Sequence, residues 1–254
     1  MKRIIGVLMV GICAMGTIAP AAAASPLKGE ITVSAAASLT DSFTALAKAF
    51  RAANPKVKVR LNFASSSTLV AQIQSGAPSD VIAAADMSSV EKLVTSGNVV
   101  AAPRVFARNS LSVAVKPGNP EKVKSINDLA RLKTIALCGK TVPCGVYAST
   151  VLARSGVAIN ESNITRGADV KATLGAVVTG DADAAIVYKT DVVAAGKTIH
   201  VVDIAVSSNV KAMYGIASIR GSKNASLAKA FVDFVLSEQG WKILKGFGFQ
   251  KSHE

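Results

Sequence analysis

Short apolar runs alternate with stretches of helical periodicity along the chain after residue 29. Residues 30–36, 56–63 and 81–84 have the apolar pattern of strands. Residues 39–53 and 87–96 instead repeat apolar side chains at the spacing of an amphipathic helix. A strand, a helix and a second strand in succession form a crossover, which favours a parallel sheet covered by helices on both faces. The sequence therefore predicts an α/β fold with mainly parallel sheets.

The pattern starts again after Ala107, with strands over 110–115, 134–137 and 184–188 and a helix over 125–132. It ends with a strand over 213–219 and two helices, and no long flexible linker separates the halves. A chain of 254 residues that is 50% apolar can bury two cores. We therefore expect two lobes, with lobe I formed by residues 25–107 and 215–254 and lobe II by residues 108–214.

The N-terminus has the three parts of a secretory signal peptide. Lys2 and Arg3 precede an apolar run over 4–18, and four alanines at 21–24 provide a cleavage site. The run is interrupted and shorter than the roughly 20 residues of a membrane span. Cys13 would be the acylated residue of a lipoprotein, but the bulky Ile12 stands where such signals usually carry a small residue. We expect residues 1–24 to be removed and the mature protein to be periplasmic without a lipid anchor.

The charge of the chain is strongly positive. Removal of Lys2 and Arg3 lowers the formal net charge from +13 to 13 − 2 = +11. Lys and Arg are scattered and aromatic residues make up only 5% of the chain, which argues against nucleic-acid binding. A basic surface of this kind attracts small anions.

Two cysteines, Cys138 and Cys144, remain after the signal peptide, with a short loop containing Gly and Pro between them. In an oxidising, exported compartment this spacing predicts a structural disulfide. A catalytic redox pair is the weaker interpretation, because the spacing is not Cys-x-x-Cys.

Small hydroxyl residues occupy two predicted junctions between a strand and a helix, at 35–40 and 63–68. The first amides of a helix have no intrahelical acceptor, and the helix dipole is positive there, so two such junctions can enclose an oxyanion. Ser38 and Asp41 also have the spacing of a capping box. The alternative is that Ser38 and Ser66 are helix N-caps and nothing more.

Patterns typical of enzymes are missing from the sequence. Its two histidines, His200 and His253, are not part of a Ser/His/Asp or metal-ligand pattern. The sequence also lacks a Gly-x-Ser-x-Gly elbow, a P-loop and a dinucleotide fingerprint. We therefore expect a binding protein and not an enzyme.

Five motifs occur in an order and spacing that span nearly the whole mature chain. They are Ala35-Ala-Ala-Ser-Leu-Thr40, Phe63-Ala-Ser-Ser-Ser-Thr68, Ser75-Gly-Ala-Pro-Ser-Asp80, Pro143-Cys-Gly-Val-Tyr147 and Ala185-Ile-Val-Tyr188. Together they resemble the molybdate-binding (ModA) proteins of ABC importers. The resemblance implies a two-lobed periplasmic-binding-protein fold of type II, with the ligand in the cleft between the lobes. It also implies a monomer without a cofactor that serves an inner-membrane ABC permease.

The resemblance implies five ligand-binding positions. Ser38 and Ser66 match the contacts of the first lobe, while Cys144 and Val170 would donate backbone N–H groups and Tyr188 its phenol. Cys144 departs from the family, which usually has Ala at that position, although a backbone donor tolerates the change. Taken alone, Val170 is typical of a core residue and Tyr188 of a half-buried strand aromatic. Molybdenum would be held only as molybdate, through its oxygens.

The donor set favours an anion that carries no proton, because such an ion has only acceptor oxygens. A phosphate site would contain an acceptor for the bound proton, and commonly an Asp or an Arg. None of the five positions is charged. The longer metal–oxygen bonds of molybdate and tungstate favour these ions over sulfate at fixed donors. The alternative is a protein of the same fold that binds sulfate or another small oxyanion.

Overall fold

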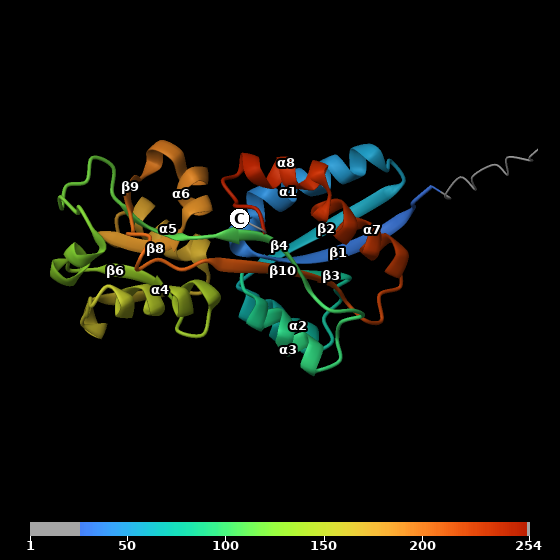
Figure 1. Cartoon of the computed structure of the whole chain (residues 1–254), viewed down its shortest axis with the longest axis horizontal. Helices are drawn as coiled ribbons and strands as arrows, with labels where there is room; N and C mark the ends of the chain where they lie inside the picture. Colours follow the sequence, from blue (N-terminus) through green and yellow to red (C-terminus); the bar gives the residue numbers. More distant parts are fainter. Residues whose placement is uncertain (1–25, 253–254) are drawn as a thin grey trace, which may run out of the picture.

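The computed structural model describes residues 26–252, so the expected signal peptide (1–24) and Cys13 lie outside the described residues. The described chain contains two sheets of five strands each (Figure 1). The first sheet has the order β2-β1-β3-β10-β4, with β1 (Gly29–Ala36), β2 (Val57–Ala64), β3 (Val81–Ala84), β4 (Arg104–Asn109) and β10 (Ala212–Ser218). The second has the order β7-β6-β8-β5-β9, with β5 (Leu111–Val115), β6 (Ile135–Cys138), β7 (Ile164–Gly167), β8 (Ala184–Tyr188) and β9 (His200–Asp203).

Both sheets are mainly parallel, as predicted. In the first sheet, β1 runs parallel to β2 and β3, and only β10 runs antiparallel to its two neighbours, β3 and β4. In the second sheet, β6 runs parallel to β7 and β8, and only β5 runs antiparallel to its neighbours, β8 and β9. In each sheet, therefore, four strands run in one direction and one strand runs in the opposite direction.

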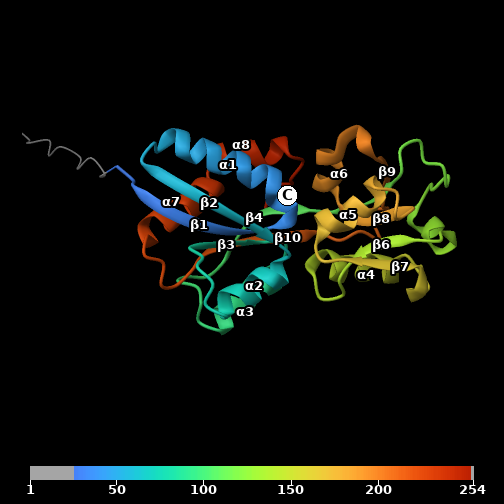
Figure 2. The same cartoon turned by 180° about the vertical axis from the view of Figure 1, so that it is seen from behind.

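Helices cover both faces of each sheet (Figure 2). On the first sheet, one face carries α1 (Thr40–Ala53), α7 (Ala225–Leu236) and α8 (Glu238–Gly246), and the other carries α2 (Ser66–Gln74) and α3 (Met87–Thr95). On the second sheet, α5 (Val170–Val178) and α6 (Lys189–Ala195) lie on one face and α4 (Pro143–Arg154) on the other. The described chain also contains short 3-10 turns: η1 (Ala37–Leu39), η2 (Ile126–Arg131), η3 (Glu161–Asn163) and η4 (Gly196–Thr198).

The helix expected over 125–132 is the 3-10 turn η2 and not an α-helix. Its start is a capping box, because the Asp128 carboxylate accepts the backbone N–H of Ser125 at 3.0 Å and the Ser125 side chain accepts in return. The same carboxylate also accepts the N–H of Lys124 at 2.8 Å. These bonds satisfy the amides within a short turn, so the segment does not need a longer helix.

Edge-to-face aromatic contacts pack α1 against α7 in the core of the first sheet. The ring centroids of Phe50 and Phe231 lie 5.2 Å apart, and those of Phe43 and Phe231 lie 6.3 Å apart. Phe43 and Phe231 have no exposed surface. Burial of aromatic side chains of this size contributes strongly to stability, and it holds α1, with the junction before it, against the sheet.

The chain passes between the two sheets twice, through β4 and β10, which pair with each other. The expected lobe boundaries, at 107–108 and at 214–215, fall within these two strands. The register of β10 against β4 shifts between Tyr214 and Gly215, at the second of these positions. The assignment of residues to lobes stays a prediction, although the two sheets divide the chain in the same sense. Between residues 26 and 252, no helix has the length and apolar character needed to span a membrane.

Candidate functional site

One small pocket brings together all five residues that the sequence predicts for the site. It lies where strands of both sheets end and the following helices begin. Outside the carboxyl ends of the strands is where ligands usually bind in open α/β sheets. The pocket is lined by Ala36, Ala37, Ser38, Ser65, Ser66, Ala85, Val142, Pro143, Cys144, Asp169, Val170 and Tyr188.

Ser38 lies in η1, directly after β1, and its hydroxyl bonds to the Tyr214 hydroxyl at 2.9 Å. The predicted capping box with Asp41 is wrong, since α1 begins at Thr40 and no side chain caps it. Asp41 instead pairs with Lys171 Nζ at 2.9 Å. The 3-10 turn before α1 directs the Ser38 hydroxyl to β10, so Ser38 is not an N-cap.

Ser66 is the first residue of α2, and the N-cap of this helix is its neighbour Ser65. Ser65 Oγ accepts the backbone N–H of Thr68 at 3.2 Å. Ser66 Oγ accepts the backbone N–H of Ala85 at 3.0 Å, and the residue is 2% exposed. A serine hydroxyl that accepts from the protein keeps its own hydrogen for another partner. Ser66 can therefore donate to a ligand in the pocket.

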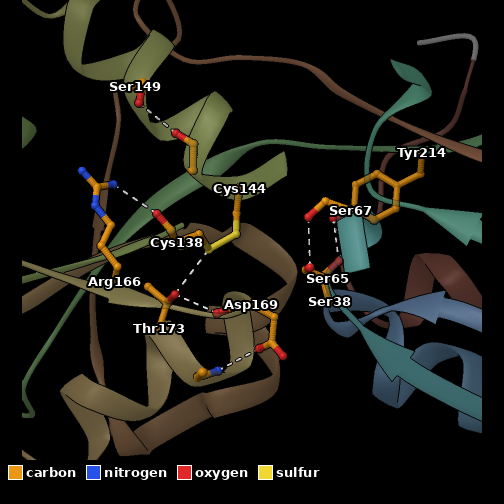
Figure 3. The surroundings of a disulfide bond; sticks show 12 residues. Ser38, Ser65, Ser67, Cys138, Cys144, Ser149, Arg166, Asp169, Thr173 and Tyr214 are labelled. Atoms are coloured by element: carbon orange, nitrogen blue, oxygen red, sulfur yellow. Dashed lines mark hydrogen bonds between the residues drawn. A yellow bond between two sulfur atoms is a disulfide. The ribbon is translucent and has the colours of Figure 1, made fainter. Parts of the chain in front are cut away.

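At the start of α4, Cys144 provides the first amide, because Pro143 has no N–H. The structure joins Cys144 to Cys138 in a disulfide with Cα atoms 5.8 Å apart, on the side of the pocket opposite Ser38 (Figure 3). Thr173 Oγ1 donates to Cys138 Sγ at 3.3 Å. The loop is so tight that a Cβ on Gly145 would lie 2.1 Å from the carbonyl oxygen of Gly139. The amide of Cys144 is thus held in place by its surroundings.

Val170 is the first residue of α5, and its side chain is 3% exposed within the core. Its side chain therefore packs as a core residue while its backbone lines the pocket. The N-cap is Asp169, whose Oδ1 accepts the N–H of Ala172 at 2.9 Å. Asp169 also lines the pocket, although it is not among the five residues that the sequence predicts for the site. An Asp before an apolar helix start is a recognisable N-cap signal.

Tyr188 is fully buried at the end of β8, with 1% of its surface exposed, so it is not half-buried. Its hydroxyl has no hydrogen-bond partner among residues 26–252. Burial raises the pKa of Tyr188 well above its usual value, and the hydroxyl therefore keeps its proton. A buried donor without a partner costs about 1–3 kcal/mol, which a ligand in the pocket would offset.

Four buried residues beside the pocket, Asn109, Tyr214, Thr190 and Asp191, have no signal in the sequence. Asn109 Nδ2 donates to the Tyr214 hydroxyl at 3.2 Å and to Thr190 Oγ1 at 2.9 Å. Asp191 lies nearby with Lys171 Nζ at 3.8 Å from its Oδ1. Burial raises the pKa of Asp191 to about 7, against the lowering effect of Lys171 and of the Tyr188 backbone N–H. These residues come from distant parts of the chain, so only the fold brings them together.

Apart from the carboxylate of Asp169, whose Oδ1 already accepts the Ala172 N–H, the pocket offers neutral donors to an anion. None of its lining residues, all within the described chain, is a Lys, Arg or His. Three helices begin at the pocket, and their first amides and dipoles present partial positive charge. In residues 26–252, no group of His, Cys, Asp or Glu side chains is arranged to hold a metal ion. The arrangement can bind an oxyanion through hydrogen bonds.

Comparison with known proteins gives a family that covers most of the chain. The family described as bacterial extracellular solute-binding protein matches residues 31–250. The molybdate-binding protein ModA of Mycobacterium tuberculosis is 34% identical over 248 residues, which cover 96% of this chain and 94% of that protein. The ModA protein of Escherichia coli is 32% identical over 231 residues, covering 87% and 89% of the two chains.

Solved structures share the fold at lower identity. The periplasmic molybdate-binding protein of Azotobacter vinelandii superimposes with a TM-score of 0.78 at 22% identity, covering 86% of this chain and 98% of that chain. A sulfate-binding protein of Mycobacterium tuberculosis gives a TM-score of 0.77 at 19% identity, covering 88% of this chain and 87% of that chain. The two-lobed fold is therefore the one expected from the sequence. The chain belongs to the bacterial extracellular solute-binding proteins and, among them, to the ModA family.

Proposed function

We propose that this protein captures molybdate, and tungstate with it, outside the cytoplasm and delivers the ion to an inner-membrane ABC permease. The observation that carries this proposal is the Tyr188 hydroxyl, which is buried, has no partner among the described residues and lines the same pocket as Ser38 and Ser66. The similarity to ModA proteins along nearly the whole chain supports molybdate as the ligand.

We assign the ligand contacts to five residues: Ser38, Ser66, Cys144, Val170 and Tyr188. Hydroxyl hydrogens would come from the two serines and the tyrosine, and amide hydrogens from the starts of α2, α4 and α5. A neutral donor contributes about 1.5–3 kcal/mol to a charged partner. Several such donors at fixed positions favour a dianion whose oxygens all accept.

Delivery of the ion to a permease requires export of the protein and closure of its two lobes. Residues 1–24 would direct export to the periplasm, where the protein would act as a soluble monomer without catalytic activity. Lobe I (25–107 and 215–254) and lobe II (108–214) would close on the ion and present a surface to the permease. Closure of this kind is the common response of two-lobed binding proteins to a ligand.

Calorimetry and thermal unfolding of the mature protein with molybdate, tungstate, sulfate and phosphate test the proposal. Molybdate and tungstate should raise the melting temperature most, since a ligand that binds only the folded state stabilises it. Tyr188→Phe, Ser38→Ala and Ser66→Ala should each weaken molybdate binding by about 10- to 100-fold. Ser149→Ala, which changes an exposed serine of α4, should bind like the wild type.

Two results would contradict the proposal. A stronger response to sulfate than to molybdate would favour the sulfate-binding alternative. Unchanged molybdate affinity in Tyr188→Phe and in both serine variants would show that the ion does not bind in this pocket.

A further inference from the structure

We infer that Asn109 and Tyr214 are positioning residues that direct the Ser38 hydroxyl to donate into the pocket, and that they thereby set its preference for oxyanions without a proton. This inference rests on the proposed function, because it concerns the same pocket. Asn109 and Tyr214 do not line the pocket themselves, but they would give it ligand selectivity through Ser38.

The orientation of the Asn109 amide is fixed by its neighbours. Its Oδ1 accepts the backbone N–H of Ser110 at 2.9 Å, so the acceptor end of the amide faces that donor. The Nδ2 end therefore faces the Tyr214 hydroxyl at 3.2 Å and Thr190 Oγ1 at 2.9 Å. Asn109 is 1% exposed, so water does not compete for these bonds. The amide group consequently presents hydrogens, not lone pairs, to Tyr214.

The direction of the next bond follows from the first. The Tyr214 oxygen accepts from Asn109, and its own hydrogen is left to donate to Ser38 Oγ at 2.9 Å. Tyr214 has no exposed surface, and burial raises the pKa of its phenol well above the usual value, so the hydrogen is present at neutral pH. Its ring is held by edge-to-face contacts with Phe106 and Phe249, whose ring centroids lie 6.1 Å and 5.4 Å from that of Tyr214.

Ser38 therefore accepts on the protein side and has its own hydrogen free for the pocket. Ser66 has the same arrangement with a backbone donor, the N–H of Ala85 at 3.0 Å. Both serines are thus oriented to donate to a ligand. Hydrogen phosphate carries an O–H group that needs an acceptor, whereas sulfate and molybdate carry none. Because both serines donate, neither can accept the proton of hydrogen phosphate, and the side of the pocket that they form discriminates against the protonated ion.

The test is a double-mutant cycle on the mature protein, with molybdate affinity measured by calorimetry. Tyr214→Phe removes the donor to Ser38 and should weaken binding by about 5- to 10-fold, since the Ser38 hydroxyl is then free to turn. In the Ser38→Ala background the same change should have almost no further effect. In the Ser66→Ala background it should retain its full effect, because Ser66 Oγ accepts from the backbone N–H of Ala85 and not from Tyr214. Tyr147→Phe is the matched control, since Tyr147 does not line the pocket and should bind normally.

Asn109→Asp is a second variant that reverses the chain of bonds. A carboxylate accepts from Tyr214, which then accepts from Ser38, so Ser38 no longer donates to the ligand. Binding should weaken more than in Tyr214→Phe, and the part of the loss due to charge alone is measured in the Ser38→Ala background. This variant also tests the inference if Tyr214→Phe does not fold.

Competition for bound molybdate measures the selectivity directly. Sulfate should compete better than hydrogen phosphate against the wild type, and the two should become more alike in Tyr214→Phe. Additive effects of Tyr214→Phe and Ser38→Ala would overturn the inference and leave the molybdate site intact. Failure of the wild type to bind any of these ions would overturn the proposed function instead.

Discussion

Asp191 is a carboxyl group that the fold buries almost completely. It is 1% exposed at the start of α6, and its nearest cation is Lys171 Nζ at 3.8 Å. Asp41 and Asp169 also face it, and their negative charges add to the effect of burial. Together they raise the pKa of Asp191 to about 7, despite Lys171 and the backbone N–H of Tyr188.

This raised pKa predicts a pH dependence of stability. Between about pH 4 and pH 7 the folded protein holds a proton at Asp191 that the unfolded chain has released. The contribution of the Asp191 proton to the free energy of unfolding is therefore complete below about pH 4. It decreases above that pH and is lost as the pH rises through about 7. Asp191→Asn has no charge to bury, so its free energy of unfolding relative to the wild type should increase by up to about 4 kcal/mol from pH 4 to pH 8. Urea unfolding at several pH values measures this, and parallel profiles for the two proteins would contradict it.

At the same scale, the sequence identified the residues of the pocket better than their roles. Ser38 and Ser66 both line it, but neither caps a helix, because Ser65 has that role on α2 and no side chain has it on α1. A serine before a helix looks the same in either case. Its hydrogen-bond partner decides the role, and the partners here are Tyr214 and Ala85, which lie far away in the sequence.

At the scale of elements, the start of α4 depends on the disulfide loop. The loop closes after only six residues and already contains a bond from the Val142 N–H to the Gly139 carbonyl at 3.0 Å. The disulfide therefore adds to a turn that the backbone has partly formed. Its main consequence is expected at the Cys144 amide, which lines the pocket.

Replacement of both cysteines by serine should have two measurable effects. The chain-entropy estimate for so short a loop gives a loss of about 2 kcal/mol in the free energy of unfolding. The amide of residue 144 is retained, so molybdate binding should weaken by only about 2- to 10-fold, through looser positioning. Chemical denaturation and calorimetry measure these effects, with Thr150→Ala on the same helix as the control. Unchanged affinity would show that the hydrogen bonds of the loop are sufficient.

The strands that the sequence pattern did not predict are β4, β7 and β9. All three lie at an edge of their sheet. An edge strand has fewer neighbours to bury its side chains, and β7 and β9 are largely exposed or half-buried. Their apolar pattern is consequently weak, whereas the central strands β3, β5, β6 and β8 are buried throughout and were predicted.

At the scale of the whole molecule, one ion pair connects the elements around the two sheets. Lys171 on α5 of the second sheet contacts Asp41 on α1 of the first, with Nζ and Oδ2 2.9 Å apart. Both side chains are more than a third exposed, Lys171 at 35% and Asp41 at 49%. A pair of this exposure contributes about 0–1 kcal/mol and is screened by salt. It can favour this arrangement of the two sheets only slightly.

Asp41→Asn should therefore raise the dissociation constant for molybdate by about 2- to 5-fold, mainly through faster release. The effect should disappear in 1 M salt, where the ion pair is screened in the wild type as well. Stopped-flow measurement of release tests this. Asp233→Asn breaks a pair within α7, to Lys229 at 2.6 Å, and should leave release unchanged. A loss of molybdate affinity in Asp41→Asn that persists at high salt would show that Asp41 does not act through its ion pair with Lys171.

The sequence by itself determined the α/β class, the mainly parallel sheets, the two-part division and the residues at the helix starts. These features depend on local periodicity and on the side chains at each junction between a strand and a helix. Both are properties of residues that are consecutive in the sequence. Only the tertiary structure decided the partners: Tyr214 and Asn109 behind Ser38, the isolated Tyr188 hydroxyl, and the burial of Asp191 beside Lys171. The physical reason is that hydrogen-bond direction and burial depend on contacts between residues that the fold, and not the order of the chain, makes neighbours.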